Sequence, residues 1–398
     1  MPDNSLSTLR LKRTFLTPAA CDIQEFRKLV ERTTTLADYP LAAEIVSNVP
    51  VYDGDAARRA AESPAARIEW MTEWADAMIN GPGIVAIRRA YADTAPIDAV
   101  SVIFQDIIAE QHRTNTASSD HFAKPGANDR IWNVLEKLCL RDPALFAAYH
   151  GNPVVDMVCQ AWLGPGYQMT AQVNQVNPGG AAQSAHRDYH MGFQTTEQIA
   201  HFPAHAHRLS PVLTLQGAIV HTDMPLETGP TLYLPYSQTY LPGYIATGLD
   251  PFKAYFAAHH VQLPLKKGDC SFFNPATFHA AGHNKTTNVK RLANLVQVSS
   301  AYGRAMETVD RTAMAKVLYP VLLGLKASGK MEALAIDSAI AASAEGYAFP
   351  TNLDRDPPAG GLAPKSPAVV MKDALAAGWT AAKFAETLDQ MAVKRLTS

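Results

Sequence analysis

The triplet His186-Arg187-Asp188 is the first place where residue types and spacing point to chemistry. It follows a run of strand-forming residues and a glycine turn at 178–180. In an extended strand, residues two apart project from one face, so His186 and Asp188 can reach the same ion. With a second histidine from elsewhere, the set would leave three positions of an octahedral metal open, which suits non-haem Fe(II). The lack of thiolate ligands argues against structural zinc.

Alone, a His-x-Asp triplet is weak support for a metal site, because the chain has 13 histidines and the pair also occurs as a hydrogen-bonded surface turn. Two downstream segments make the pattern more specific. Residues 228–238 read TGPTLYLPYSQ, and residues 268–291 contain GDCSFFNP, then HAAGHNKT, and end in an arginine. Together with the triplet, these segments resemble the phytanoyl-CoA dioxygenase family over residues 167–299. That family consists of Fe(II)- and 2-oxoglutarate-dependent oxygenases.

The resemblance implies roles for two further residues. His279 matches the distal iron ligand, while the rival His283 falls at a variable position of the family motif. Arg291 matches the anchor for the far carboxylate of 2-oxoglutarate, and its planar donors suit that group. Lys290 is the competing candidate, because the interval from His279 to the arginine is one residue longer than usual.

Other residues are expected to line the pocket. Gln175 and Gln216 lie inside strand-like runs, where a glutamine needs a partner; bound 2-oxoglutarate or a structural hydrogen bond explains either one. The residues that follow the metal triplet are candidates for the substrate pocket: Tyr189, His190 and Phe193. Ala281 stands where family members often carry a hydroxyl group, so one co-substrate contact is left without a candidate.

The implied activity is that of a 2-oxoglutarate-dependent dioxygenase with Fe(II), 2-oxoglutarate and O₂. It would hydroxylate a small or medium organic metabolite and release succinate and CO₂. Desaturation or ring formation can use the same iron, whereas Asp188 disfavours a halogenase, in which a small residue replaces the carboxylate. No catalytic residue beyond the metal ligands is predicted. Two alternatives are a cupin-type metalloenzyme that does not use 2-oxoglutarate, which would not need Arg291, and a non-catalytic barrel module, which would not bind iron.

The elements that must position these residues change along the chain. Before residue 160, the spacing of apolar residues is mainly helical, with a start signal at Ser63 and Pro64. The helices predicted there cover residues 22–33, 64–79, 128–149 and 154–163, with one strand at 83–88. From residue 167, short β-rich runs between turns predict strands at 168–177, 211–221, 231–235, 260–265, 270–274 and 292–299. Beyond residue 302 the pattern is helical again, with a final helix at 368–395.

This order predicts an all-β core, a double-stranded β-helix or jelly-roll of the cupin type, with extensive flanking α-helices. We expect an oxygenase domain at residues 1–302, divided into a helical part at 1–166 and the jelly-roll core at about 167–302. Residues 303–398 would form a C-terminal helical extension packed on the core. The helical regions are candidates for a lid, a homodimer surface or substrate selectivity.

Composition excludes several other classes. Of the 398 residues, 47% are hydrophobic and 18% are charged, as in an ordinary globular protein, and the net charge of −2 argues against a nucleic-acid binder. The four cysteines are far apart and form no C-x-x-C pair. Neither a signal-peptide-like start nor a long apolar run is present. We therefore expect a cytoplasmic protein whose partner is a small molecule, not a membrane or a nucleic acid, but composition does not identify the substrate.

Overall fold

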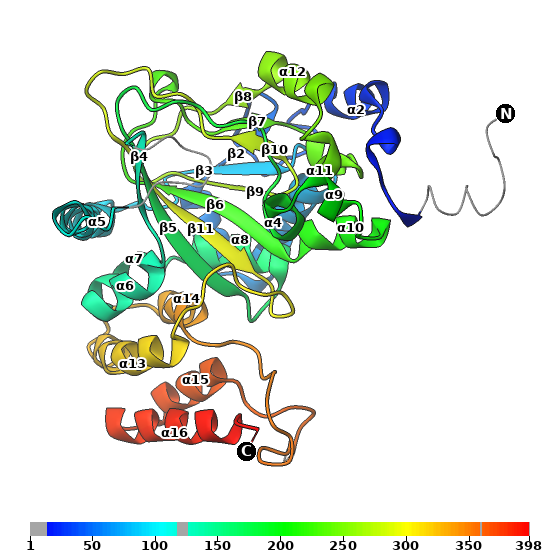
Figure 1. Cartoon of the computed structure of the whole chain (residues 1–398). Coiled ribbons are helices and arrows are strands. Elements are labelled where there is room, and N and C mark those ends of the chain that lie inside the picture. The colour runs from blue at the N-terminus through cyan, green and yellow to red at the C-terminus, as the bar shows by residue number, and fades with distance from the viewer. Residues whose placement is uncertain (1–13, 118–125, 359, 398) are drawn as a thin grey trace.

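The computed structural model describes residues 14–117, 126–358 and 360–397; residues 1–13 of the predicted helical part lie outside it. Its centre is a mixed eight-stranded sheet accompanied by a three-stranded sheet (Figure 1). The large sheet contains, in spatial order, β1 (Glu44–Val46), β2 (Val49–Asp53), β3 (Ile84–Arg88), β9 (Cys270–Phe273), β6 (Thr214–Val220), β11 (Arg291–Ser299), β5 (Gln168–Val176) and β4 (Asn128–Ile131). The small sheet contains β10 (Phe278–Ala280), β7 (Leu232–Leu234) and β8 (Val261–Gln262).

The expectation of an all-β core that begins near residue 167 is too simple. Strands β1 to β4 precede that residue and extend both edges of the large sheet. The β2–β3 pair is parallel, while the other neighbours are antiparallel, so the sheet is mixed. Of the strands before residue 167, only β3 corresponds to one predicted from the sequence.

Helices make up most of the remaining regular structure. From the N-terminus they are α2 (Ile23–Val30), α3 (Gly54–Ala61), α4 (Pro64–Ile79), α5 (Ala95–Arg113), α6 (Val134–Arg141), α7 (Pro143–His150), α8 (Pro153–Leu163), α9 (Thr196–Ile199), α10 (Ala204–Val212), α11 (Gly243–Ala246), α12 (Asp250–His259), α13 (Arg311–Ala327), α14 (Ala333–Ser343), α15 (Pro367–Ala377) and α16 (Ala381–Lys394). Short 3₁₀ turns are η1 (Pro18–Ala20), η2 (His190–Phe193), η3 (Leu226–Thr228) and η4 (Ser237–Thr239).

The helix predicted at 64–79 is confirmed, with Ser63 as its N-cap and Pro64 in the first turn. The single helix predicted at 128–149 is wrong. Its first residues form β4, because they pair with β5, and a break at Asp142 and Pro143 separates α6 from α7. The final predicted helix is likewise two helices, α15 and α16, separated at Gly378, whose φ is +63°.

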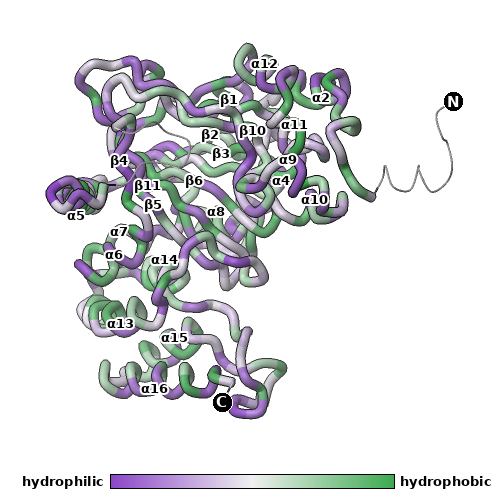
Figure 2. The backbone as a smooth tube through the Cα atoms, viewed as in Figure 1, coloured by the Kyte–Doolittle hydropathy of each residue, from purple (hydrophilic) through white to green (hydrophobic). Residues whose placement is uncertain are grey.

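Strand β5 shows how the sheet separates a polar face from an apolar one. Met169, Ala171 and Val173 point into a large hydrophobic core that also includes residues of α6, α7, α8 and α13 to α16. Residues 172 and 174, which alternate with them, face the opposite side of the sheet. The helices of the C-terminal region lie beyond α6 and α7 (Figure 1), and α16 alternates between hydrophobic and hydrophilic residues (Figure 2). None of the described helices has the length and apolar content to cross a bilayer.

Candidate metal centre

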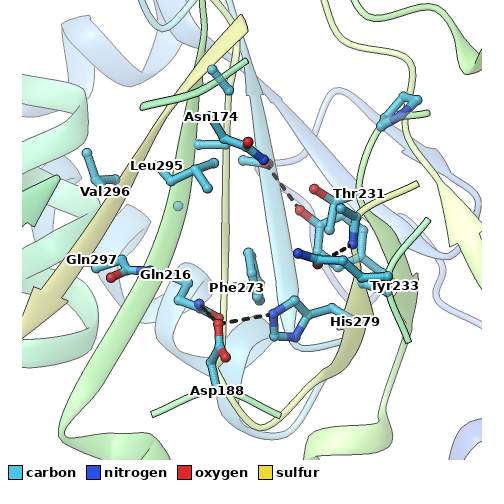
Figure 3. Close-up of a pocket in the computed structure, with 18 of the residues that line it drawn as sticks. Asn174, Asp188, Gln216, Thr231, Tyr233, Phe273, His279, Leu295, Val296 and Gln297 are labelled. Atoms are coloured by element: carbon cyan, nitrogen blue, oxygen red, sulfur yellow. Dashed lines mark hydrogen bonds and ion pairs between the residues drawn. The ribbon is translucent and has the colours of Figure 1, made fainter. Parts of the chain in front are cut away.

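A cavity of about 1080 Å³, including its opening to solvent, lies on the inner face of the large sheet. Gln216 of β6 lines it from the large sheet, and Tyr233 of β7 and His279 of β10 line it from the small one (Figure 3). Arg291 of β11 also lines it from the large sheet. The two sheets therefore bring residues that are far apart in the sequence to one space. Its lining combines apolar side chains with a few polar and charged groups, as is usual for small-molecule sites.

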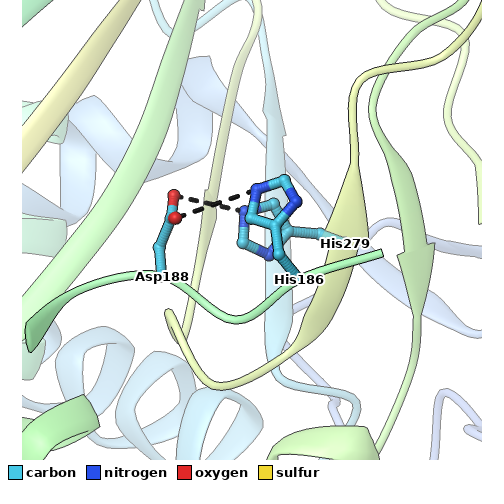
Figure 4. A group of neighbouring side chains, drawn as sticks. All are labelled: His186, Asp188 and His279. Atoms are coloured by element: carbon cyan, nitrogen blue, oxygen red, sulfur yellow. Dashed lines mark ion pairs between the residues drawn. The ribbon is translucent and has the colours of Figure 1, made fainter. Parts of the chain in front are cut away.

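His186, Asp188 and His279 gather at one end of this cavity (Figure 4). Backbone hydrogen bonds in both directions join His186 to His279, with N···O distances of 3.0 and 3.1 Å, and the Asp188 amide donates to the Pro275 carbonyl at 3.0 Å. The three residues offer ligand atoms that all lie within 4.8 Å of one another. The segment around the triplet is thus held in an extended pairing with β10, and one ion can reach all three side chains.

The protonation of both imidazoles is determined by backbone carbonyls. Nδ1 of His186 lies 2.9 Å from the Ser184 carbonyl, and Nδ1 of His279 lies 2.8 Å from the Thr277 carbonyl. A carbonyl oxygen only accepts, so each Nδ1 carries the proton and each Nε2 presents its lone pair toward the carboxylate. The Nε2 atoms lie 3.8 and 3.5 Å from the Asp188 oxygens. This donor set fits a divalent metal held through two Nε2 atoms.

Asp188 is buried and kept ionised by its neighbours. Burial alone would raise the pKa of the Asp188 carboxyl, but His186 and His279 and a hydrogen bond from the Gln216 amide hold that pKa below its usual value. Tyr244 also donates from its hydroxyl to the Asp188 carbonyl at 3.1 Å. The carboxylate is therefore available as a negatively charged ligand at neutral pH.

The side chain of Arg187, which lies between His186 and Asp188 in the sequence, points away from the cavity. It anchors the segment that carries these two residues. Its guanidinium donates to the carbonyls of Ser237 and Tyr240 at 2.5 and 2.9 Å. The rings of Tyr244 and Phe278 each lie 5.2 Å from the guanidinium carbon. Burial lowers the pKa of Arg187 to about 10, so the group still carries a charge at neutral pH.

Arg291 lies in the cavity as a buried cation, 6% exposed, whereas Lys290 is exposed. One guanidinium nitrogen donates weakly to the Thr228 carbonyl at 3.4 Å, and no acidic side chain in the described residues forms an ion pair with it. Burial lowers the pKa of Arg291 to about 10, so the guanidinium remains charged at neutral pH. A buried, charged and largely unpaired guanidinium is costly unless an anionic ligand binds it.

The other predicted residues divide between cavity and scaffold. Gln216 and Phe193 line the cavity, but Tyr189, His190 and Gln175 do not. Tyr189 and His190 adopt positive φ angles, +65° and +47°, that turn the chain away after Asp188.

The prediction of a co-substrate contact at Gln175 is wrong in this geometry. Its side chain faces the helical side of β5, where it accepts a hydrogen bond from Gln105 at 2.7 Å and donates one to Asp129 at 2.9 Å. The rival ligand His283 is exposed and bonds to the Gly180 carbonyl, outside the cluster.

Several cavity residues were not identified from the sequence. Arg130 and Trp132 come from β4 and the turn after it, in a segment predicted to be helical. Asn174 of β5 and Gln297 of β11 lie in segments that were correctly predicted as strands. The polar residues that alternate with apolar ones in residues 168–176 are the signal that would have found Asn174.

A comparison with protein families agrees with the resemblance found in the sequence. The family model described as phytanoyl-CoA dioxygenase (PhyH) matches residues 52–292. Similar solved structures include the non-heme alpha ketoglutarate dependent epimerase SnoN from nogalamycin biosynthesis, at 18% identity and a TM-score of 0.40 over 60% of this chain and 85% of that chain. They also include the carbocyclase SnoK from the same biosynthesis, at 18% identity and a TM-score of 0.41 over 61% of this chain and 86% of that one.

No curated protein matches the chain. The family model nevertheless spans well over half of the sequence and includes all three clustered ligand residues and Arg291. The chain belongs to the phytanoyl-CoA dioxygenase family.

Proposed function

We propose that this protein is a non-haem Fe(II)- and 2-oxoglutarate-dependent oxygenase in which His186, Asp188 and His279 bind the iron. The observation that carries the proposal is the cluster of two Nε2 atoms and one carboxylate in a cavity that also contains the buried Arg291 guanidinium. Two histidines and one carboxylate without a thiolate favour Fe(II) over structural zinc. When bound, Fe(II) with 2-oxoglutarate and dioxygen would supply the oxidation of a C–H bond and release succinate and CO₂.

The chain's own residues bind and orient the reactants. Arg291 would hold the far carboxylate of 2-oxoglutarate in a bidentate pair. Tyr233 lies close enough to Arg291 for the two groups to interact electrostatically. We propose that its hydroxyl supplies the contact that Ala281 cannot make. Apolar side chains, among them Val220, Met224 and Leu263, surround this part of the cavity and would exclude water from the ion pair.

Finer features are part of the proposal as well. The two sheets around the cavity support the double-stranded β-helix architecture, with the C-terminal helices as an extension packed on it. Hydroxylation is the expected outcome, because the Asp188 carboxylate occupies the position that a halogenase would leave open for a halide. A cupin-type enzyme without 2-oxoglutarate is disfavoured, since it would gain nothing from the buried Arg291.

Anaerobic titration with Fe(II) and 2-oxoglutarate tests the proposal. The wild-type protein should develop a weak visible charge-transfer band, and His186→Ala and His279→Ala should each abolish it. The matched control is His283→Ala, which removes a nearby exposed histidine outside the cluster and should keep the band. A normal band in both ligand variants would rule out this metal site. If both ligand variants lack the band, succinate formation in a metabolite screen identifies the substrate.

A further inference from the structure

Two glutamines form a cross-strand pair beside the metal centre. Gln216 of β6 and Gln297 of β11 are direct register partners, so their side chains project from the same face of the sheet. Both are 6% exposed, and both line the cavity next to Asp188 (Figure 3). A primary amide has a donor end and an acceptor end, so what this pair offers to a ligand depends on how each amide is turned.

The orientation of Gln216 follows from its partner. Its Nε2 donates to Asp188, and the ionised carboxylate can only accept. The other end, Oε1, is buried and accepts no hydrogen bond from any described residue. Gln216 therefore presents an unsatisfied acceptor. The acceptor-only carboxylates of 2-oxoglutarate cannot satisfy this oxygen, so its partner must be a donor on another molecule.

A chain of hydrogen bonds gives Gln297 the opposite orientation. Arg130 can only donate, and its Nη2 donates to Oε1 of Gln172 at 3.0 Å. The Nε2 of Gln172 must then face away from Arg130, and it donates to Oε1 of Gln297 at 3.0 Å and to the sulfur of Met306 at 3.5 Å. Gln297 is left with its Nε2 group, for which the described part of the chain provides no acceptor. Gln297 therefore presents a donor.

From this donor and acceptor pair, we infer that the substrate carries a group that both accepts and donates a hydrogen bond, a hydroxyl or a carboxamide, close to the position that is oxidised. The inference rests on the proposed function, because it describes the substrate of the same site. An ether, ketone or carboxylate would leave the Gln216 acceptor unsatisfied, and an ammonium group would leave the Gln297 donor unsatisfied. Either mismatch in a buried site costs roughly tenfold in affinity.

Probes that share a cyclohexyl ring and differ in hydrogen-bonding capacity test this. Cyclohexanol and cyclohexanecarboxamide can donate and accept, methoxycyclohexane only accepts, and cyclohexylammonium only donates. Their affinities are measured by calorimetry on the full chain with Fe(II) and 2-oxoglutarate under anaerobic conditions. Cyclohexanol or cyclohexanecarboxamide should bind roughly tenfold more tightly than the other two probes. The stronger of the two identifies the substrate group as a hydroxyl or a carboxamide.

Substitutions distinguish the effect of the hydrogen-bond chain from Arg130 through Gln172 to Gln297, here called the relay, from the effect of burial alone. Gln297→Glu replaces the donor with an acceptor, so the preference for cyclohexanol over cyclohexylammonium should fall at least tenfold. Gln172→Glu does not alter a cavity-lining residue, but a carboxylate cannot donate to Gln297, whose amide must then turn its oxygen into the cavity. Gln172→Glu should therefore also lower the preference for cyclohexanol over cyclohexylammonium. The control is Gln168→Glu, which adds the same charge to β5 outside the relay, where the side chain bonds to Ser300 and Gly303 carbonyls.

Each result decides the inference. Equal affinities for the probes in wild type, or an unchanged preference in Gln297→Glu, would overturn it while the charge-transfer band leaves the proposed function intact. If Gln172→Glu does not fold, Gln297→Glu carries the test alone. Absence of the band in the wild-type protein would overturn the proposed function, and the inference with it.

Discussion

At the scale of single residues, the two neighbouring cations at 290 and 291 lie in opposite environments. Lys290 is exposed, while the Arg291 guanidinium is buried in the cavity and has only a long hydrogen bond to the Thr228 carbonyl. A buried cation with so little local compensation is stabilised when an anion binds it. Its environment makes Arg291, and not Lys290, the candidate to bind a carboxylate of 2-oxoglutarate.

We predict that Arg291→Ala raises the concentration of 2-oxoglutarate needed for the charge-transfer band by roughly tenfold to a hundredfold, since a charge-assisted bidentate pair is lost. Arg291→Lys should recover part of the affinity, because a point charge replaces the fork. Lys290→Ala is the matched control and should have little effect. If only the Lys290 variant raises the requirement, the anchor is Lys290.

The sequence predicted that His186, Asp188 and His279 belong to one site, and they do cluster, because spacing along one strand and a family motif define them locally. It did not predict which face of β5 carries Gln175, since strand alternation can be assigned only once one residue of the strand is placed. The relay from Arg130 through Gln172 to Gln297 was out of reach for the same reason. It depends on the register of β4, β5 and β11, which come from distant parts of the chain.

At the scale of elements, Arg187 fastens the metal loop to the turn formed by η4 and the start of α11. We predict that Arg187→Met lowers the free energy of unfolding by about 2–4 kcal/mol, because two buried carbonyls lose their donor. The affinity for Fe(II) should fall too, since the ligands on either side lose their support. Urea unfolding and metal titration measure the two effects.

One further variant should reproduce the effect of Arg187→Met, and a second variant serves as its control. Gly243 lies directly against the guanidinium, and a Cβ there would clash with it, so Gly243→Ala should produce the same combined loss. Arg208→Met removes an exposed arginine of α10 and should change stability by less than about 0.5 kcal/mol. Normal Fe(II) affinity in a folded Arg187→Met protein would show that the loop is held by other contacts.

A buried network around His221 joins helices to the large sheet. Asn294 of β11 donates to the Tyr149 hydroxyl at 3.2 Å, and this hydroxyl lies 2.7 Å from Nε2 of His221. On the other side, Nδ1 lies 2.9 Å from the Ser101 hydroxyl, which donates to the Ile97 carbonyl. These partners define a neutral imidazole that accepts at Nε2 and donates at Nδ1.

Burial lowers the pKa of His221 to about 3, with smaller influences from Asp98, His150 and Lys267. The unfolded chain binds a proton near pH 6.5 and the folded chain does not, so stability is lost as the pH falls from about 6.5 toward 3. We predict that His221→Gln, which keeps one donor and one acceptor, reduces this loss by up to about 1.4 kcal/mol per pH unit. Urea unfolding at pH 7 and pH 5 measures it.

The control is a substitution of the same kind at an exposed histidine, His201→Gln, measured at the same two pH values. A slope in His221→Gln equal to that of wild type would mean that other groups cause the acid sensitivity. Buried His150, whose pKa burial also lowers to about 3, would be the next candidate.

Helix boundaries were predictable where local signals decide them, as at Ser63 and Pro64. Residues 128–131 were not, because they directly precede a segment with helical apolar spacing and only pairing with β5 makes them a strand. The same tertiary pairing brings Arg130 to the cavity. Because β4 was predicted to be helical, Arg130, the first residue of the hydrogen-bond relay, was not recognised from the sequence.

At the scale of the whole molecule, the C-terminal helices share one hydrophobic core with the sheet and the N-terminal helices. Met314, Leu318 and Leu322 of α13 are fully buried in it. Strands from both sides of residue 167 also belong to one sheet. The order of segments in the sequence, helical then β then helical, predicted a core domain with a C-terminal helical extension packed on it. The hydrophobic core is continuous across these segments, so we expect one cooperative unit.

Phe384 of α16 tests that expectation far from the metal centre. Its side chain is fully buried and stacks on Tyr319 of α13, with ring centroids 4.2 Å apart. Phe384→Ala should lower the free energy of unfolding by about 3–5 kcal/mol and the melting temperature of the entire protein, because a core ring is lost. The control Val393→Ala, at an exposed position of the same helix, should change little.

Differential scanning calorimetry with and without Fe(II) and 2-oxoglutarate gives the decisive comparison. Ligands that bind only the folded state raise the melting temperature of whatever unfolds together with their site. If the molecule is one cooperative unit, a single transition should be shifted down by Phe384→Ala and up by the ligands, with the Kd for 2-oxoglutarate unchanged at low temperature. Two transitions, one sensitive only to the substitution and the other only to the ligands, would instead show that α15 and α16 unfold independently of the oxygenase core.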